Sequence, residues 1–152
     1  MSLFKIPHES WVVVCDGARA LFLENIGDAE RLNLRLGERS AQDDEPSREI
    51  GTDRPGRSHS SVGNGRSAME ETDWHEQAEQ DFLKQTAERI NALVYEKTIE
   101  DYVLIAPPSA IGTLRQYLDQ QATAALREEI QKELTNQPVP EIEKHLARLM
   151  EA

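Results

Sequence analysis

The stretch WVVVCDGARALFLEN, residues 11–25, decides the fold that this sequence predicts. An uninterrupted apolar run ends at Cys15, and an Asp16-Gly17 pair separates it from a second apolar run that ends at Leu23. An Asp-Gly pair is typical of a two-residue hairpin turn, because both central positions need a positive φ that Gly adopts freely and Asp tolerates. We therefore predict a β-hairpin in which Asp16 and Gly17 form the structural turn.

The first strand of this hairpin is expected to be buried on both faces. Residues 12–15 are Val-Val-Val-Cys, without any alternation of polar and apolar side chains. That pattern is typical of a central strand with helices above and below it. The periodicity of the remaining sequence predicts further elements, namely strands near 32–36, 102–106 and 127–134, and helices near 74–97, 108–121 and 141–152. This order predicts an α/β fold, with a mixed β-sheet and flanking helices in a single domain.

The last predicted strand, residues 127–134, is open to two interpretations. Intrinsic propensity favours a continuation of the preceding helix. The spacing of Leu126, Glu128 and Ile130 instead resembles the alternation of a strand. We interpret the segment as a strand, because the sheet otherwise has no final strand after the crossover helix.

Length, charge and cysteine content limit the class of protein. A chain of 152 residues fits one domain, and a net charge of -11 disfavours broad binding to nucleic acid or anionic membranes. The beginning, MSLFKIPHES, has no apolar segment of the signal-peptide kind. We therefore expect a cytoplasmic protein with no membrane partner and no DNA partner. The single cysteine, Cys15, has no disulfide partner and is predicted to be a small core residue.

A long polar segment separates the third predicted strand from the helix for which Asp73 is the predicted N-cap. The apolar pattern is interrupted from about residue 39 to residue 72, and loops of this length are usually either functional or disordered. Within it, residues 54–66 (RPGRSHSSVGNGR) are basic and glycine-rich and contain no acid, although the protein as a whole is acidic. The predicted RNA- or phosphate-binding residues are Arg54, Gly56, Arg57, His59, Gly63, Gly65 and Arg66. The alternative is a solvated loop without a ligand.

No pattern in the sequence indicates catalysis, a metal or a cofactor. The carboxylates of Asp16, Glu70, Glu71 and Asp101 stand nearest to element ends and could hold Mg²⁺ in a nuclease of the ribonuclease H type. Each also has a structural explanation as a turn, strand-entry or pre-helix residue. The four histidines lack the paired spacing of a zinc site, and no serine stands in a nucleophile elbow. We therefore predict no catalytic residue, no metal ligand and no cofactor.

Five segments carry a resemblance to a known family, namely VVVCDGARALFLEN, DRPGRSHSS, HEQAEQDFLKQTAERIN, YVLIAPPSAIGTLR and EIQKELTNQPVPEIEKHL. In their order and spacing they are similar to the bacterial family called "protein required for attachment to host cells", a name that describes a phenotype. That family is similar to the middle domain of archaeal and eukaryotic peptide release factors. The resemblance therefore implies a ribonuclease-H-like α/β fold of the type found in translational machinery components.

The resemblance also implies where the function lies. In release factors, the loop between the third strand and the long helix carries a Gly-Gly-Gln motif that reaches the peptidyl-transferase centre. The matching segment, PGRSHSSVGNGRSA, has Gly63 and Gly65 but no Gln, so the residue that would coordinate the hydrolytic water is missing. We expect a domain of this lineage that contacts ribosome or RNA and is not an enzyme. Two alternatives stay open: a metal-dependent nuclease or phosphoesterase with Asp16 as a ligand, and a module that binds another protein.

Overall fold

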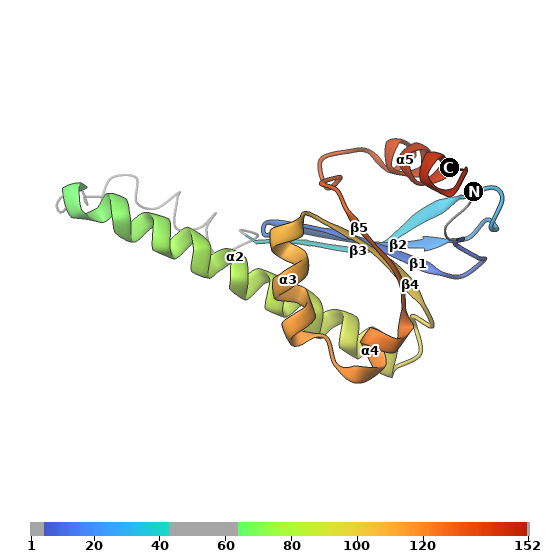
Figure 1. Ribbon diagram of the computed structural model, residues 1–152, viewed down its shortest axis with the longest axis horizontal. Helices are drawn as coiled ribbons and strands as arrows, with labels where there is room; N and C mark the ends of the chain where they lie inside the picture. The colour runs from blue at the N-terminus through green and yellow to red at the C-terminus, as the bar shows by residue number, and fades with distance from the viewer. Residues whose placement is uncertain (1–4, 43–63, 152) are drawn as a thin grey trace.

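The computed structural model describes residues 5–42 and 64–151, and for residues 64–73 and 151 it describes the backbone alone. In these ranges the chain forms five strands and four helices (Figure 1). The strands are β1 (Trp11–Cys15), β2 (Arg19–Asn25), β3 (Leu34–Ala41), β4 (Tyr102–Ala106) and β5 (Leu126–Gln131). The helices are α2 (Asn64–Tyr95), α3 (Pro108–Tyr117), α4 (Gln120–Ala125) and α5 (Val139–Glu151).

The five strands form one mixed sheet in the order β3-β2-β1-β4-β5. Strands β1, β2 and β3 make an antiparallel meander, whereas β1, β4 and β5 run parallel to one another. In the centre, Val13 lies opposite Phe22 of β2 on one side and Leu104 of β4 on the other. Every residue of β1 is buried, as its sequence predicts. The structure thus confirms a single α/β domain with a mixed sheet and flanking helices.

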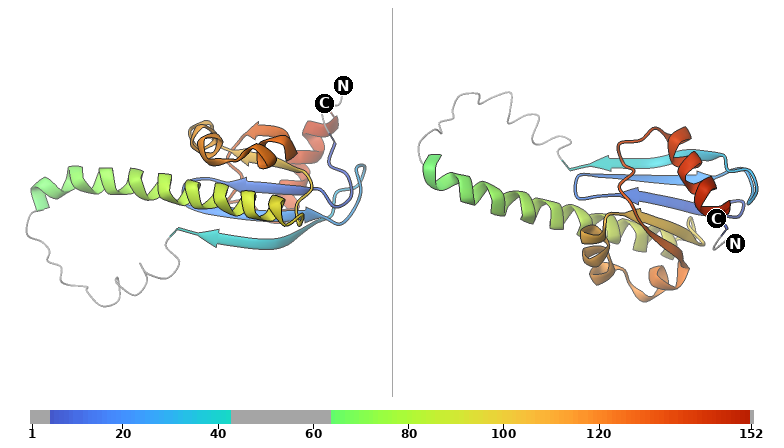
Figure 2. Two further views of the ribbon diagram at one scale, coloured as in Figure 1. Left: turned by 90° about the horizontal axis from the view of Figure 1, so that it is seen from below. Right: turned by 45° about the horizontal axis from the view of Figure 1, so that its top comes forward.

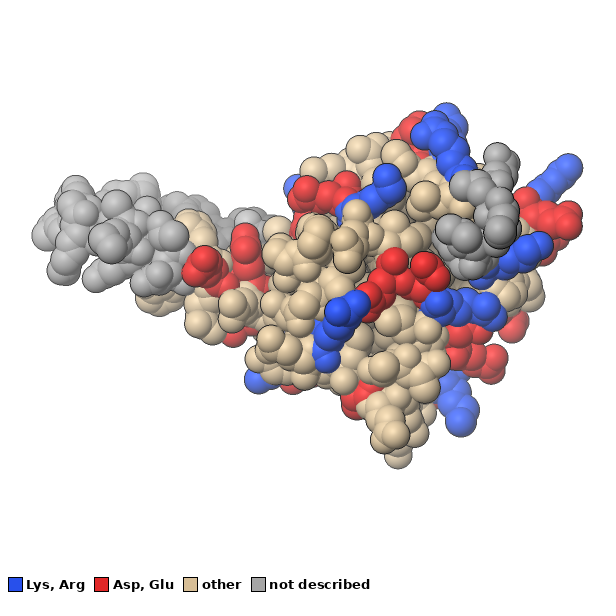
Figure 3. All heavy atoms as spheres, viewed as in Figure 1, with Lys and Arg blue, Asp and Glu red and all other residues tan. Residues whose placement is uncertain are grey.

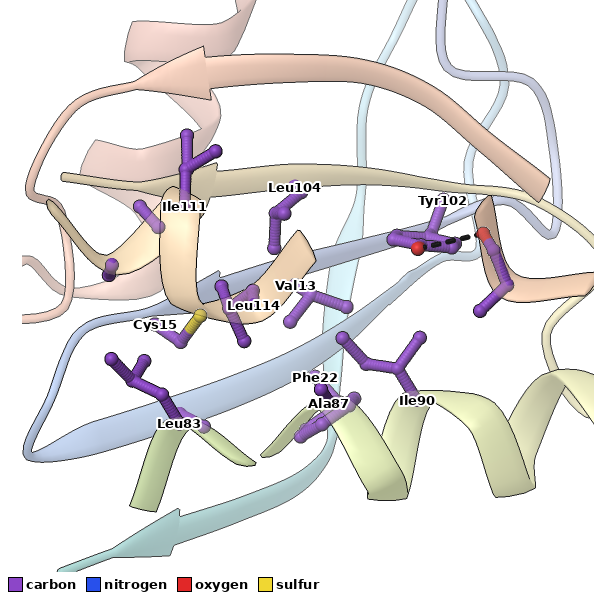
Figure 4. Close-up of a cluster of buried hydrophobic side chains, with 14 of the residues drawn as sticks. Val13, Cys15, Phe22, Leu83, Ala87, Ile90, Tyr102, Leu104, Ile111 and Leu114 are labelled. Carbon is purple, nitrogen blue, oxygen red and sulfur yellow. Dashed lines mark hydrogen bonds between the residues drawn. The ribbon is translucent and has the colours of Figure 1, made fainter. Parts of the chain in front are cut away.

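Helices cover the two faces of the sheet unequally. Helices α2, α3 and α4 lie on one face, and α5 alone lies on the other (Figure 2). Because side chains alternate along a strand, Val13 and Cys15 of β1 point into the first of these layers and Val12 and Val14 into the second. In the larger core the buried Tyr102 hydroxyl donates to the Ala122 carbonyl oxygen at 2.9 Å, so that its polar group is satisfied (Figure 4).

The hairpin is confirmed, but its turn is built differently from the predicted Asp-Gly turn. The amide of Asp16 donates to the carbonyl of Arg19 at 2.9 Å, so the two central residues are Gly17 and Ala18. Asp16 does not have a positive φ. Its Oδ1 instead accepts from the amides of Ala18 and Arg19, each at 2.8 Å. The carboxylate, as a local acceptor, determines the turn.

Gly17 is required for space, because α2 passes over the turn. A Cβ atom at this position would lie 2.9 Å from Cγ of Glu79 on α2. That separation is shorter than real Cβ contacts allow, so a larger residue would displace either the glutamate or the helix. Gly17 therefore lets the hairpin end and α2 approach each other closely.

The predicted ends of several elements differ from the observed ones. Strand β3 continues to Ala41 and α2 begins at Asn64, so the predicted loop of residues 39–72 is shorter at both ends and Asp73 lies inside the helix. Good helix formers such as Ala68 and Glu70 allow α2 to extend without an apolar stripe. The predicted helix 108–121 is two helices, because the Asp119 carboxylate accepts from the Ala122 amide at 2.8 Å and starts α4.

The final strand and the last helix are present. Strand β5 pairs in parallel with β4, and Ile130 lies opposite Ile105, which supports the strand interpretation of the ambiguous segment. Helix α5 buries Ile142 and Leu146 against the sheet. Within the part of the chain that the structure describes, no helix combines the length and apolar character needed to cross a bilayer.

Candidate nucleic-acid interface

Helix α2 is much longer than the sheet on which it packs. Its 32 residues span about 48 Å at 1.5 Å per residue. The longest strand, β3, has 8 residues and spans only about 27 Å. Both views in Figure 2 show the N-terminal part of α2 running beyond the sheet. We call residues 64–81 of α2 the projecting arm.

The C-terminal part of α2 is attached firmly to the sheet. Phe82 is the first of its described side chains to be buried, and Ala87 and Ile90 follow on the same side of the helix. The guanidinium of Arg89 donates to both carboxylate oxygens of Glu38 on β3, each at 2.8 Å. This bidentate hydrogen bonding raises the pKa of Arg89 above its ordinary value. The projecting arm therefore extends from a fixed base.

Two of the predicted RNA-binding residues lie at the distal end of this arm. Gly65 and Arg66 belong to the first turn of α2 instead of a loop. The remaining five lie outside the described residues, namely Arg54, Gly56, Arg57, His59 and Gly63. Because β3 ends at Ala41 and α2 begins at Asn64, residues 43–63 join the edge strand to the distal end of the arm. This is the position, between the third strand and the long helix, that the family resemblance implies for the functional segment.

The described part of the projecting arm has exposed acidic side chains and no basic lysine or arginine. Glu76, Glu79 and Asp81 are all exposed, and residues 74–81 contain no lysine or arginine. Figure 3 shows this acidic surface where the arm leaves the sheet. Trp74 is 73% exposed, because α2 has already passed the end of the sheet at that position. These acidic side chains repel phosphate, so residues 74–81 of the arm do not favour contact with a polyanion.

Of the four carboxylates considered for a metal site, Asp16 and Asp101 do not converge, and the side chains of Glu70 and Glu71 lie outside the described part of the chain. Asp16 follows the carboxyl end of β1, whereas Asp101 precedes β4, which runs parallel to β1, so the two lie at opposite ends of the sheet. The second oxygen of Asp16 accepts from the Thr135 hydroxyl at 2.7 Å, and Asp101 pairs with Arg127 at 3.1 Å. Among the described residues, no group of three or more potential metal ligands is found.

Two observations could have been derived from the sequence. The acidic character of the described part of the arm is visible in WHEQAEQD, residues 74–81, which contains three acids and no lysine or arginine. The exposure of Trp74 follows from a strand length of 5 to 8 residues, which is too short to support a helix of more than eight turns.

The comparison with curated proteins gave no match. A comparison with family models matched residues 9–146 to the family described as "Bacterial archaeo-eukaryotic release factor family 12". The match begins just before β1 and ends within α5, so it includes the whole sheet, α2 and the segment between β3 and α2. The chain therefore belongs to the bacterial archaeo-eukaryotic release factor family 12.

Proposed function

We propose that this protein contacts ribosomal or other RNA through residues 54–66, the segment that leads along the chain into the distal end of the projecting arm. The observation that supports this proposal is the geometry of α2, a long helix fixed at Phe82 and Arg89 that begins far from the sheet. A basic, glycine-rich segment in that position reaches a target while the acidic body of the protein stays at a distance.

Membership in a release-factor family supports a role at the ribosome. We propose binding without peptide hydrolysis, because the sequence from Arg54 to Ala68 contains no Gln to coordinate a hydrolytic water. The proposal assigns the protein to the cytoplasm. We also infer a ribonuclease-H-like sheet, which the continuation of an antiparallel meander into two parallel strands supports.

The decisive experiment is co-sedimentation of the purified protein with ribosomes over a series of salt concentrations. We expect binding that weakens with salt, and the double variant Arg57→Ala/Arg66→Ala should bind more weakly with a salt slope smaller by about 1 to 2. Ribonuclease treatment of the ribosomes should abolish the association if RNA is the ligand.

A matched control removes the same charge elsewhere. Arg31, in the connection between β2 and β3, and Arg148, on α5, are both exposed. That connection and α5 both lie away from the projecting arm (Figure 1). The double variant Arg31→Ala/Arg148→Ala should bind as the unmodified protein does. Equal weakening in both double variants would show that only the overall charge matters, and unchanged binding in Arg57→Ala/Arg66→Ala would contradict the proposal.

A further inference from the structure

A cavity of about 560 Å³ opens on the α5 side of the sheet, beside the start of that helix. One wall comes from β2 and β3, through residues such as Leu21 and Leu36. The other comes from Gln137, in the connection between β5 and α5, and from Val139 at the start of α5. Its volume lies within the range of about 300 to 1,000 Å³ that is typical of small-molecule sites. The cavity is separate from residues 54–66 in the sequence and from the exposed arm.

The strand pairing explains why two arginines face this cavity. Arg19 lies opposite Ala41, and Leu21 lies opposite Arg39, in the antiparallel pair of β2 and β3. Directly opposed residues point to the same face, so both arginines share the α5 face with Leu21. Helix α5 contacts that face farther along β3, where the Leu34 amide donates to Glu143 at 2.6 Å, and leaves Leu36 42% exposed.

One of the two arginines is held in position. A guanidinium N–H of Arg19 donates to the side-chain oxygen of Asn136 at 2.7 Å. Asn136 directly precedes Gln137, which lines the cavity, so this hydrogen bond joins the two walls. Asp16, the carboxylate nearest in sequence, is already engaged by the Thr135 hydroxyl and by the amides of its own turn. An incoming anion therefore meets a guanidinium whose position is already restricted.

The charge of this cavity differs from that of two other surface cavities. A cavity between α2 and α4 has one cation and one anion, Lys97 and Glu100, and a smaller one at the hairpin turn has Glu76 and Glu79. The described lining of the cavity at β2 and β3 contains two arginines and no acid. The protein has a net charge of -11, so this lining is a local region of positive charge on an acidic surface. Such a site favours the binding of an anion.

The apolar lining narrows the class of anion. Between the arginines, Leu21, Leu36 and Val139 form an apolar surface that inorganic phosphate alone would leave uncovered. Guanidinium groups bind phosphate through paired, charge-assisted hydrogen bonds. We propose that this cavity binds a small organic phosphate with an apolar or planar group, of which a mononucleotide is the simplest example. The phosphate contacts Arg19 and Arg39, and the planar group lies on Leu21 and Leu36.

The test is a calorimetric titration of the full-length protein with adenosine monophosphate and, separately, with inorganic phosphate. We expect saturable binding of the nucleotide and at least tenfold weaker binding of inorganic phosphate. Arg19→Ala/Arg39→Ala should weaken nucleotide binding by about tenfold or more, since two charge-assisted contacts are lost. Leu36→Glu, at an exposed position, should do the same while it leaves both arginines and the Asn136 contact in place.

The matched control is Arg35→Ala, on the same strand but on the opposite face, where Arg35 pairs with Glu24. It should bind the nucleotide as the unmodified protein does, and so should Arg57→Ala/Arg66→Ala, which separates this site from the proposed RNA contact. Absence of saturation in the unmodified protein, or equal affinity in folded Leu36→Glu, would overturn the proposal. If short single-stranded RNA binds and loses affinity in Arg19→Ala/Arg39→Ala while the nucleotide does not bind, the cavity takes backbone phosphates and the proposal is wrong.

Discussion

Gly37 lies under the ring of Trp11, which reaches across β2 from the centre of the sheet. The register between β2 and β3 shifts at Phe22, and Gly37 is the extra residue of this β-bulge. A Cβ atom at Gly37 would lie 2.8 Å from two carbons of the Trp11 ring. We expect Gly37→Ala to lower the free energy of unfolding by about 1 to 3 kcal/mol through overpacking, as measured by urea denaturation.

Gly112 provides the control for this substitution. It lies in α3, and an added Cβ would meet no atom within 4 Å. Gly112→Ala should therefore stabilise the protein by about 0.5 to 1 kcal/mol, because alanine is the better helix former. If Gly37→Ala unfolds at the same urea concentration as the unmodified protein, the Trp11 ring does not exclude a Cβ atom at position 37.

Cys15 gives the stability a dependence on alkaline pH. Burial in the core, with a smaller contribution from Asp16, raises the pKa of its thiol from an ordinary value of 9.0 to about 12. The folded protein keeps the proton between these values while the unfolded chain loses it, so stability falls as pH rises from 9 towards 12. The slope from this group is about 1.4 kcal/mol per pH unit.

The conservative variant Cys15→Ala isolates that contribution from lysine and tyrosine titration. Below pH 9 the difference in unfolding free energy between the unmodified protein and Cys15→Ala should be constant. Above pH 9 the unmodified protein should lose unfolding free energy relative to Cys15→Ala. Parallel pH profiles up to pH 11 would show that the thiol is not buried as described.

At the scale of elements, the two tryptophans report on opposite parts of the molecule. Trp11 is 8% exposed in the core, whereas Trp74 on the projecting arm is 73% exposed. Trp11→Phe should leave a red-shifted emission that acrylamide quenches efficiently, and Trp74→Phe should leave a blue-shifted emission that is quenched weakly. A protected, blue-shifted Trp74 at high protein concentration would indicate that the arm is covered in solution by a second molecule.

The elements that could be predicted from the sequence are those whose burial is nearly complete. Strands β1 and β4 are buried at every position, so unbroken apolar runs determine them. The start of α2 could not be predicted, because beyond the sheet a helix has no apolar stripe. The division between α3 and α4 was missed, although Asp119 is a good N-cap residue, because the apolar spacing continues across it.

The two candidate sites also differ in how much of each can be recognised in the sequence. The basic segment around Arg57 is a prediction that the sequence alone can make, because its residues are consecutive. The cavity with Arg19 and Arg39 could not be predicted, because it depends on the register of β2 with β3 and on where α5 begins. A site whose residues are brought together by strand pairing has no signature along the chain.

At the scale of the whole molecule, the net charge of -11 acts against the compact state. Exposed ion pairs such as Arg35–Glu24 contribute less than about 1 kcal/mol each and do not offset the repulsion. We expect the melting temperature to rise between about 10 mM and about 150 mM NaCl, where the screening length falls from about 30 Å to about 8 Å. Thermal denaturation by circular dichroism measures this effect, and a falling melting temperature would contradict it.

The position of β4 next to β1, the central strand, has a consequence for how the chain folds as it is synthesised. Strand β1 needs β2 on one side and β4 on the other, and Ser10 and Asp101, which meet where β1 and β4 begin, are 91 residues apart. The meander of β1, β2 and β3 can form early from local contacts. One edge of β1 then stays without a hydrogen-bonded neighbour until α2 and β4 have left the ribosome. This interval is when the nascent protein is most prone to pair with the wrong strand.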